Sequence, residues 1–227
     1  MKLYGALASP YVARVVMVAR LKGVELEMES APGGMGSAEY KQINPTGKIP
    51  ALLTDEGLIA ESEVIAEYLE DKIPEPVLLP GDALLRAHSR AISRVTDLYV
   101  APHNSGLIRH RDPAVRDQAL VDKAAEEFEK AFSYLAHFMG PGPFAAGETP
   151  SLGDCAAAPF LILLKQTVFP HFEEIPDPTE NNERLKVWWQ ALQDHAGCKA
   201  ALDEYDAALE EFLKFLMERL RQRDSGS

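Results

Sequence analysis

Cysteine is scarce in this chain of 227 residues, and no histidine cluster accompanies it. The two cysteines, Cys155 and Cys198, lie in Ala-rich helical patterns without a Cys-x-x-Cys pair, and the six histidines are scattered. Zinc sites and redox centres need cysteine or histidine at close, regular spacing, so the sequence predicts no metal. We expect both thiols to be buried and unpaired, as is typical of a reducing compartment.

Long apolar runs and an excess of positive charge are also missing. No segment approaches the roughly 18 apolar residues of a membrane span, and the N-terminal MKLYGALASPYVAR lacks the apolar core of a signal peptide. These absences predict a cytoplasmic protein with no membrane partner. The net charge of −12 would repel phosphate backbones, which argues against nucleic acid as a partner. Hydrophobic residues make up 46%, enough for one large domain or two small ones.

The first third of the chain alternates between strand and helix patterns. Residues 2–7 predict a short strand, and the helix after them repeats apolar residues three or four positions apart. Residues 24–30 alternate apolar and acidic side chains, as a half-buried strand does. Residues 51–54 and 58–60 flank a turn and predict a hairpin, after which Ser62 is expected to cap a helix. The order β-α-β, then β-β-α, predicts a small α/β fold.

The rest of the chain is helical in character and follows a proline-rich connection. Three prolines between residues 71 and 83 cannot continue a helix. Farther on, Ser151 and Asp154 have the spacing of a capping box in front of a strongly apolar helix. We therefore predict an α/β domain at residues 1–73, a linker at 74–83 and an all-helical domain at 84–227.

Four short motifs follow one another along the chain: Ala8-Ser9-Pro10, the segment from Asn44 to Pro50, Glu61-Ser62, and Ser151-Leu152-Gly153-Asp154. Each motif alone is weak, but in this order and at these intervals they resemble the soluble glutathione transferases with a serine-type active site. The resemblance covers nearly the whole chain. It implies a thioredoxin-like α/β N-terminal domain, an all-α C-terminal domain and a homodimer. It also implies that glutathione is the co-substrate and that no metal takes part.

Ser9 is the catalytic residue that this resemblance implies, because the family places a side chain at this point against the glutathione sulfur. A free cysteine thiol has a pKa of about 8.5, so only a few per cent is ionised at neutral pH. A hydroxyl hydrogen bond to the thiolate contributes about 1.5–3 kcal/mol, and the positive end of the following helix adds roughly 0.5–1 kcal/mol. Together they can lower the thiol pKa by about one to two units. The alternative is that Ser9 only caps that helix.

The other motifs are implied to bind the peptide part of glutathione. The family pattern makes the Ile49–Pro50 bond cis, which turns the Ile49 N–H and C=O outward so that glutathione can pair with them like an added strand. Lys48 is expected to neutralise a glutathione carboxylate, unless it is merely solvated. Ser62 is expected to bind the γ-glutamyl carboxylate and Glu61 the γ-glutamyl ammonium. The alternative for Pro50 is an ordinary turn with a trans bond. The alternative for Ser62 and Glu61 is a helix cap beside a surface acid.

A pocket for the electrophile is expected between Tyr11 and the first helices of the second domain. Its predicted lining residues there are Tyr99, His103 and Leu107, each of which could instead be structural. Tyr4 resembles the thiol donor of some other classes of the family. It lies at the start of its strand, however, so we expect it to pack in the core.

The predicted function is attack of a glutathione thiolate on a hydrophobic electrophile, with peroxide reduction and dehalogenation as further possibilities. One alternative is a non-catalytic binding module of the same fold. Another is glutathione-dependent isomerisation of the maleylacetoacetate kind, although Ala8-Ser9-Pro10-Tyr11 departs from the serine-rich run of that subfamily. A serine at the sulfur position argues against mixed-disulfide chemistry.

Overall fold

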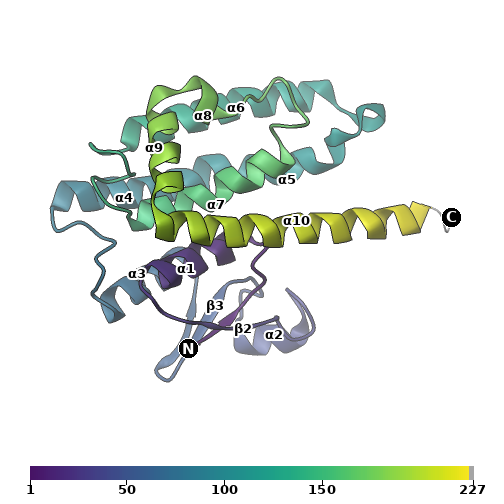
Figure 1. The fold of residues 1–227 in the computed structure, drawn as a ribbon. Coiled ribbons are helices and arrows are strands. Elements are labelled where there is room, and N and C mark those ends of the chain that lie inside the picture. Colours follow the sequence, from purple (N-terminus) through teal and green to yellow (C-terminus); the bar gives the residue numbers. More distant parts are fainter. Residues whose placement is uncertain (225–227) are drawn as a thin grey trace.

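The computed structural model describes residues 1–224, which form a sheet domain below a larger helical layer (Figure 1). In this part of the chain the sheet has four strands in the order β2-β1-β3-β4, with β1 and β2 parallel and the other neighbours antiparallel. The strands are β1 (Lys2–Tyr4), β2 (Glu27–Glu29), β3 (Ala51–Thr54) and β4 (Gly57–Ala60). The predicted β-α-β unit and hairpin are confirmed. Strands β1 and β2 are shorter than their sequence patterns indicated, because only three residues of each lie in register.

Helix α1 (Pro10–Leu21) lies between the sheet and the helical layer. It packs against α3 (Ser62–Lys72), and also against two helices of the upper layer, α7 (Leu152–Thr167) and α10 (Ala196–Asp224). The sequence predicted a single apolar face, whereas eight consecutive residues of α1, 12–19, are buried. A helix covered on several sides must be apolar on several sides, which explains its Val-rich composition. The remaining helix of the sheet domain is α2 (Ala38–Ile43).

The chain from residue 83 onward is largely helical, as predicted. Its elements are α4 (Ala83–Val95), a π-helical turn η1 (Thr96–Val100), α5 (Ala101–Leu107), two 3₁₀ turns η2 (Ile108–Arg111) and η3 (Pro113–Val115), α6 (Gln118–Phe138), α7, α8 (Pro178–Asn181), α9 (Glu183–Asp194) and α10. Helix α10 runs along the lower side of the layer and projects beyond it (Figure 1). The thioredoxin-like α/β and all-α classes are thus confirmed. Residues 225–227 of the predicted helical domain lie outside the described residues.

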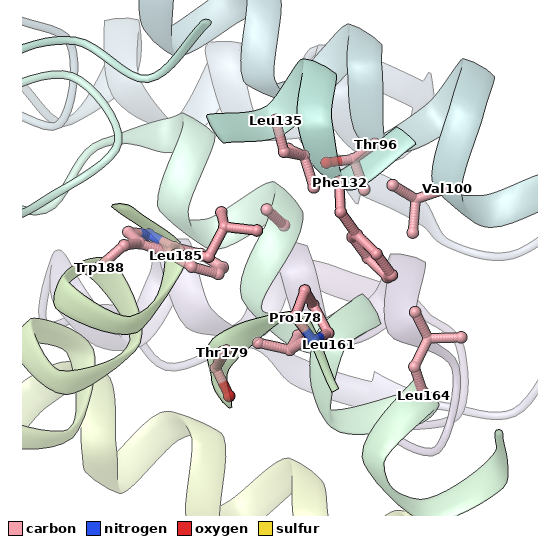
Figure 2. A pocket seen from close by; sticks show the side chains of 11 residues that line it. Thr96, Val100, Phe132, Leu135, Leu161, Leu164, Pro178, Thr179, Leu185 and Trp188 are labelled. Carbon is pink, nitrogen blue, oxygen red and sulfur yellow. The ribbon is translucent and has the colours of Figure 1, made fainter. Parts of the chain in front are cut away.

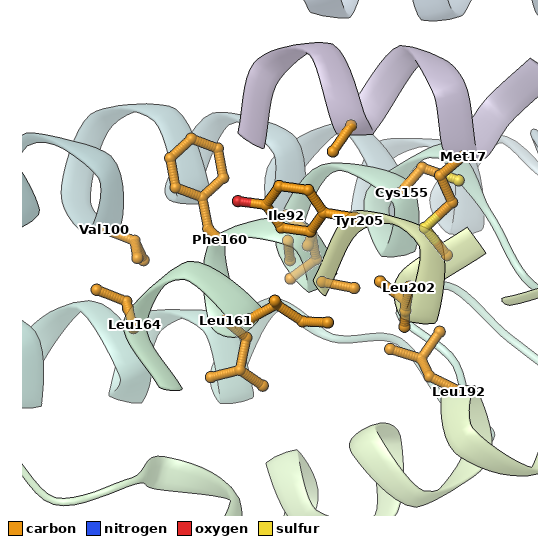
Figure 3. Close-up of a cluster of buried hydrophobic side chains, with 14 of the residues drawn as sticks. Met17, Ile92, Val100, Cys155, Phe160, Leu161, Leu164, Leu192, Leu202 and Tyr205 are labelled. Atoms are coloured by element: carbon orange, nitrogen blue, oxygen red, sulfur yellow. The ribbon is translucent and has the colours of Figure 1, made fainter. Parts of the chain in front are cut away.

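Helix α7 is the centre of the hydrophobic core. Figure 3 shows its Phe160, Leu161 and Leu164 surrounded by side chains from α1, α4, η1, α9 and α10. Cys155 and Cys198 are both buried and free, as predicted. Burial raises the pKa of the Cys155 thiol well above its usual value and raises that of Cys198 to about 12. Both thiols are therefore protonated and unreactive at neutral pH.

The connection between the two layers is fixed by a buried ion pair. Between Ile73 and Asp82 the structure has neither helix nor strand. The Lys22 ammonium lies 2.6 Å from the Glu70 carboxylate and donates to the carbonyls of Ile73 and Pro76 at 2.6 and 2.8 Å. Glu70 in turn accepts the backbone N–H groups of Leu78 and Leu79. The connection therefore has a defined path, while the exact domain boundaries stay a prediction.

The helical layer encloses a small apolar gap, drawn in Figure 2, with Phe132, Leu135 and Trp188 among its lining residues. Its volume is about 10 Å³, which is room for no more than about one water molecule. It is therefore a packing gap and not a ligand site. Among the described residues, no helix combines the length and the apolar character needed to cross a membrane.

Candidate active site

A cleft of about 650 Å³ opens between the sheet domain and α4 and brings together seven of the residues predicted from the sequence. These are Ser9, Tyr11, Lys48, Ile49, Pro50, Glu61 and Ser62. They come from the start of α1, the loop before β3 and the start of α3. The other lining residues are Met35, Thr46, Glu63, Val64, Arg94 and Asp97. Its volume is in the usual range for a small-molecule site.

Ser9 occupies the N-cap position of α1, but its side chain does not cap the helix. The backbone carbonyl of Ser9 accepts the N–H of Ala13 at 2.9 Å, while its hydroxyl makes no hydrogen bond to any described residue. The half-buried hydroxyl is therefore free to donate to an anion placed at the positive end of the helix.

The loop before β3 presents an unpaired stretch of backbone to the cleft. The Ile49–Pro50 peptide is cis, as the resemblance implied. Within the described chain, no hydrogen bond engages the N–H or C=O of Ile49. The preceding carbonyl, of Lys48, is fixed by the Tyr40 hydroxyl at 3.0 Å and the Asn44 amide at 2.8 Å. The loop is thus held from behind, while the Lys48 side chain is exposed and has no ion pair among the described residues.

The start of α3 differs from the prediction in one respect. The N-cap residue is Glu61, and Ser62 is the first helical residue, so Ser62 is not the cap that we expected. A residue at this first position still has a free backbone N–H, which is aimed out of the helix end. Glu61 is exposed and has a φ of 69°, the one positive φ outside glycine in the described chain. Such a backbone conformation is strained for glutamate and is often found at binding sites.

Behind the cleft lies a charged network that was not predicted from the sequence. Arg14 of α1 is fully buried and donates to both carboxylate oxygens of Asp97, at 2.6 and 3.1 Å. The same guanidinium donates to Glu63 at 3.3 Å and to the Ser62 hydroxyl at 3.2 Å. The network therefore joins α1, α3 and η1 directly beneath the cleft. In the sequence, the sign of this network was a single arginine, Arg14, within the apolar run of α1.

Burial governs the titration of Glu63 in this network and of Tyr11, whose ring centroid lies 5.7 Å from the Arg14 guanidinium. Burial raises the pKa of Glu63 above its usual value, although the Arg14 guanidinium acts in the opposite direction. Burial likewise raises the pKa of the Tyr11 hydroxyl, and the carboxylate of Asp97 adds to this shift. Tyr11 is therefore neutral at physiological pH. It can donate a hydrogen bond, but it is a weaker acid than free tyrosine.

The predicted electrophile residues are not all brought together. Tyr11 lines the cleft, with its ring edge-on to Phe160 at 5.0 Å. The other three predicted residues do not line it. The ring of Tyr99 is 45% exposed and packs against Tyr134, that of His103 packs against Phe128, and Leu107 is buried in the core. The helical layer instead contributes Arg94 and Asp97 to the cleft. Tyr4 is buried beside Tyr40, as predicted.

A thioredoxin-like sheet domain with a cleft at the start of its first helix, joined to an all-helical domain, is the architecture expected for a glutathione-binding enzyme. Residues 3–77 match the family model for the glutathione S-transferase N-terminal domain, and residues 118–191 match that for the C-terminal domain. The chain therefore belongs to the glutathione S-transferase family.

Similar proteins include both transferases and isomerases. The chain is 30% identical over 165 residues to glutathione S-transferase Z2 of Arabidopsis thaliana, covering 70% of this chain and 74% of that protein. It is 37% identical over 190 residues to a probable maleylacetoacetate isomerase of Caenorhabditis elegans, covering 81% and 87%. Among solved structures, the maleylacetoacetate isomerase of Anaeromyxobacter dehalogenans 2CP-1 with bound GSH superposes with a TM-score of 0.67, at 25% identity, covering 88% and 93%.

Proposed function

We propose that this protein is a serine-type glutathione transferase, which ionises glutathione in the cleft at Ser9 and directs the thiolate at an electrophile. The observation that carries the proposal is the unpartnered hydroxyl of Ser9 at the N-terminus of α1. It lies in the same cleft as the unpaired backbone of Ile49 and the start of α3. A hydroxyl donor and a helix N-terminus acting on one sulfur are enough to stabilise the thiolate by the amount required.

In this mechanism each of the three segments contacts a different part of glutathione. The N–H and C=O of Ile49 pair with the peptide backbone of glutathione, as an added strand would. The start of α3, with Ser62, binds the γ-glutamyl carboxylate, and Glu61 binds the neighbouring ammonium. Lys48 neutralises a carboxylate of the tripeptide. The Ser9 hydroxyl then donates to the sulfur, which forms a C–S bond with the electrophile as the leaving group departs or a proton is taken up from solvent.

The test is the ultraviolet absorbance of the thiolate when glutathione is added to the protein, followed by turnover on a panel of electrophiles. We expect the bound thiol to be ionised at neutral pH and at least one electrophile to be conjugated. Binding without any thiolate signal or turnover would favour the non-catalytic module. Failure to bind glutathione would overturn the proposal.

Glutathione-dependent isomerisation is the second candidate, and one observation in the cleft favours it. Arg94 of α4 lines the cleft and has no ion pair or hydrogen bond in the described chain. A free arginine suits the carboxylates of an acidic substrate, and the similar proteins include those named for maleylacetoacetate. We expect Arg94→Gln to raise the KM for a maleyl diacid several-fold and to leave that for a neutral chloronitroarene unchanged. Equal effects on both substrates would remove the support for the isomerase.

Two observations support a proposal for the cellular setting: the composition of the sequence and membership of the glutathione S-transferase family. We propose that the enzyme works as a homodimer in the cytoplasm, where reduced glutathione is available as its co-substrate.

A further inference from the structure

The cleft holds a second free hydroxyl besides that of Ser9. Tyr11 lines the cleft and is half-buried. Its hydroxyl makes no hydrogen bond to any described residue, and it is not one of the buried polar atoms that lack a partner in this part of the chain. The oxygen is therefore in contact with the cleft, where a ligand can reach it. A neutral phenol in this position can donate a hydrogen bond to an occupant of the cleft.

Two neighbours fix the ring of Tyr11. The ring of Phe160, on α7, meets it edge-on, with the two ring centroids 5.0 Å apart. The Arg14 guanidinium lies 5.7 Å from the centroid of the Tyr11 ring, at a distance where a cation is attracted to an aromatic ring. Asp97 holds that guanidinium in turn through two hydrogen bonds. The phenol is thus positioned by the protein itself, so little side-chain freedom is lost when its hydroxyl donates to a ligand.

Tyr11 and Ser9 serve different sides of the cleft. They are two positions apart at the start of α1, and side chains at that spacing on a helix do not face each other. In the proposed pose, glutathione occupies the sheet-domain side, along the loop before β3 and the start of α3. The electrophile then approaches the sulfur from the side of the helical layer, which supplies Arg94 and Asp97. The ring of Tyr11 lies toward this side, because it contacts Phe160.

We propose that Tyr11 is a second catalytic residue, whose hydroxyl donates a hydrogen bond to the carbonyl oxygen of an α,β-unsaturated carbonyl substrate. This rests on the proposed function, since it requires a glutathione thiolate beside Ser9. The thiolate forms a C–S bond to the β carbon, and the electron pairs of the conjugated system shift to leave an enolate with its negative charge on oxygen. Water then supplies a proton to the α carbon. A hydrogen bond to the anionic oxygen is stronger than one to the neutral carbonyl, so the Tyr11 hydroxyl lowers the barrier.

The titration of Tyr11 agrees with this role. Burial raises the pKa of the Tyr11 hydroxyl, and the Asp97 carboxylate adds to the shift, while the Arg14 guanidinium opposes it. A raised pKa keeps the phenol protonated over the whole range in which a free tyrosine is protonated, and somewhat above it. The hydroxyl is therefore a donor at every pH where Ser9 is expected to hold the thiolate.

The test compares two electrophiles of similar size, the enone oct-3-en-2-one and the alkyl halide 1-iodohexane. Negative charge develops on oxygen in the first reaction and on the departing iodide in the second. We expect Tyr11→Phe to lower the ratio of kcat/KM for the enone to kcat/KM for the iodide roughly tenfold or more. The matched control is Tyr68→Phe, which removes a hydroxyl beside Glu56, outside the cleft, and should leave the ratio as in the wild type. An unchanged ratio in Tyr11→Phe would overturn the proposal.

A thiolate titration separates the failure of this proposal from the failure of the proposed function. Bound glutathione should ionise at the same pH in Tyr11→Phe as in the wild type, because Ser9 and not Tyr11 contacts the sulfur in the proposed pose. A raised thiol pKa in Tyr11→Phe would show that Tyr11 acts on the sulfur, which overturns the proposal but leaves a transferase. A wild-type protein that conjugates the iodide and not the enone would do the same. Failure of the wild type to bind and ionise glutathione would overturn both.

Discussion

The free hydroxyl of Ser9 makes the most direct prediction at the scale of a single residue. Ser9→Ala removes the proposed hydrogen bond to the glutathione sulfur but keeps the dipole of α1, so the pKa of the bound thiol should rise by about one to two units. Because less thiolate is then present at neutral pH, the rate should fall roughly tenfold or more there and recover partly at alkaline pH. A thiolate absorbance titration of both proteins measures the shift.

The control for this experiment is Ser9→Thr, which keeps a hydroxyl and should retain most of the shift. The side chain of Ser9 makes no capping bond, so little stability should be lost in either variant. If the titration curves of wild type and Ser9→Ala coincide, Ser9 does not contact the sulfur. Tyr11, which also lines the cleft, then becomes the candidate donor.

Glu61 is expected to act on binding and not on the chemical step. It is placed at the start of α3, away from the residue proposed to contact the sulfur. Glu61→Ala should therefore raise the KM for glutathione roughly tenfold, which corresponds to one lost charge-assisted hydrogen bond, with kcat changed much less. Steady-state kinetics at varied glutathione measure both constants. An unchanged KM would contradict the assignment, and Glu25→Ala, at an exposed position outside the cleft, is the matched control.

The residues of the cleft differ in how far sequence could predict them. Ser9, Lys48, Ile49, Pro50, Glu61 and Ser62 stand in short local motifs, so their positions could be predicted and the structure brings them into one cleft. Arg14 and Asp97 are 83 positions apart, and nothing in the local pattern of either indicates the other. Their pairing depends on how the helical layer is placed over α1, which is a property of tertiary packing. The same dependence explains why Tyr99 was predicted to line the electrophile pocket and Arg94 was not.

At the scale of elements, the N-terminus of α7 is a junction built around the fully buried carboxylate of Asp154. The predicted capping box is present, and the Asp154 carboxylate accepts four hydrogen bonds. Its Oδ1 accepts the Ala145 N–H at 2.9 Å and the Trp188 indole N–H at 2.7 Å, and its Oδ2 accepts the Ser151 N–H and hydroxyl, each at 2.7 Å. One carboxylate therefore ties α7, α9 and the loop before α7 together. The sequence showed only the contact with Ser151, because the others are made across the fold.

Asp154→Asn tests this junction. The four neighbours of this side chain all donate hydrogen bonds, but an asparagine has an NH₂ group in place of one of the two oxygens. The variant should therefore lose at least two of the four bonds and leave buried groups unpaired. We expect the free energy of unfolding to fall by about 3–5 kcal/mol. Ser151→Ala keeps the carboxylate and should cost only about 1 kcal/mol. Urea denaturation gives both values, and equal losses in the two variants would show that the carboxylate is not the centre of the junction.

Among the elements, those with strong local periodicity and clear end signals were the ones that sequence could predict. The hairpin β3–β4 and helices α1 and α7 have such signals. The division of one long segment into α4, the π-helical turn η1 and α5 was not predicted, although it places Asp97 opposite Arg14. A π-helical turn shifts the register of a helix without any change in hydrophobic pattern, so the sequence carries little sign of it.

At the scale of the whole molecule, α1 couples the two layers. It contributes Ser9 at one end, Arg14 beneath the cleft, and an apolar surface that meets α7 and α10. Arg20 near its other end pairs with Glu204 of α10, at 2.9 Å. The cleft around Ser9 therefore depends on both layers, since the sheet domain supplies the proposed glutathione contacts and the helical layer supplies Arg94 and Asp97. A change at the contact between the layers should affect the cleft even where no lining residue is altered.

The last prediction concerns assembly. The helical layer exposes aromatic and aliphatic side chains at neighbouring positions: Leu98 is 50% exposed, Tyr99 45% and Tyr134 40%, and the rings of Tyr99 and Tyr134 contact each other edge-on at 5.4 Å. Apolar side chains grouped in this way favour burial against a partner. We therefore expect light scattering at low micromolar protein to give about twice the 25.0 kDa mass of the chain.

Tyr99→Asp with Tyr134→Asp should produce a folded monomer, because two unpaired carboxylates in a dimer contact are costly. Phe215→Asp, an equally exposed site on α10, should leave the dimer intact. A wild-type protein that scatters only as a monomer would contradict the prediction, and a dimer that survives the double substitution would show that another face is used.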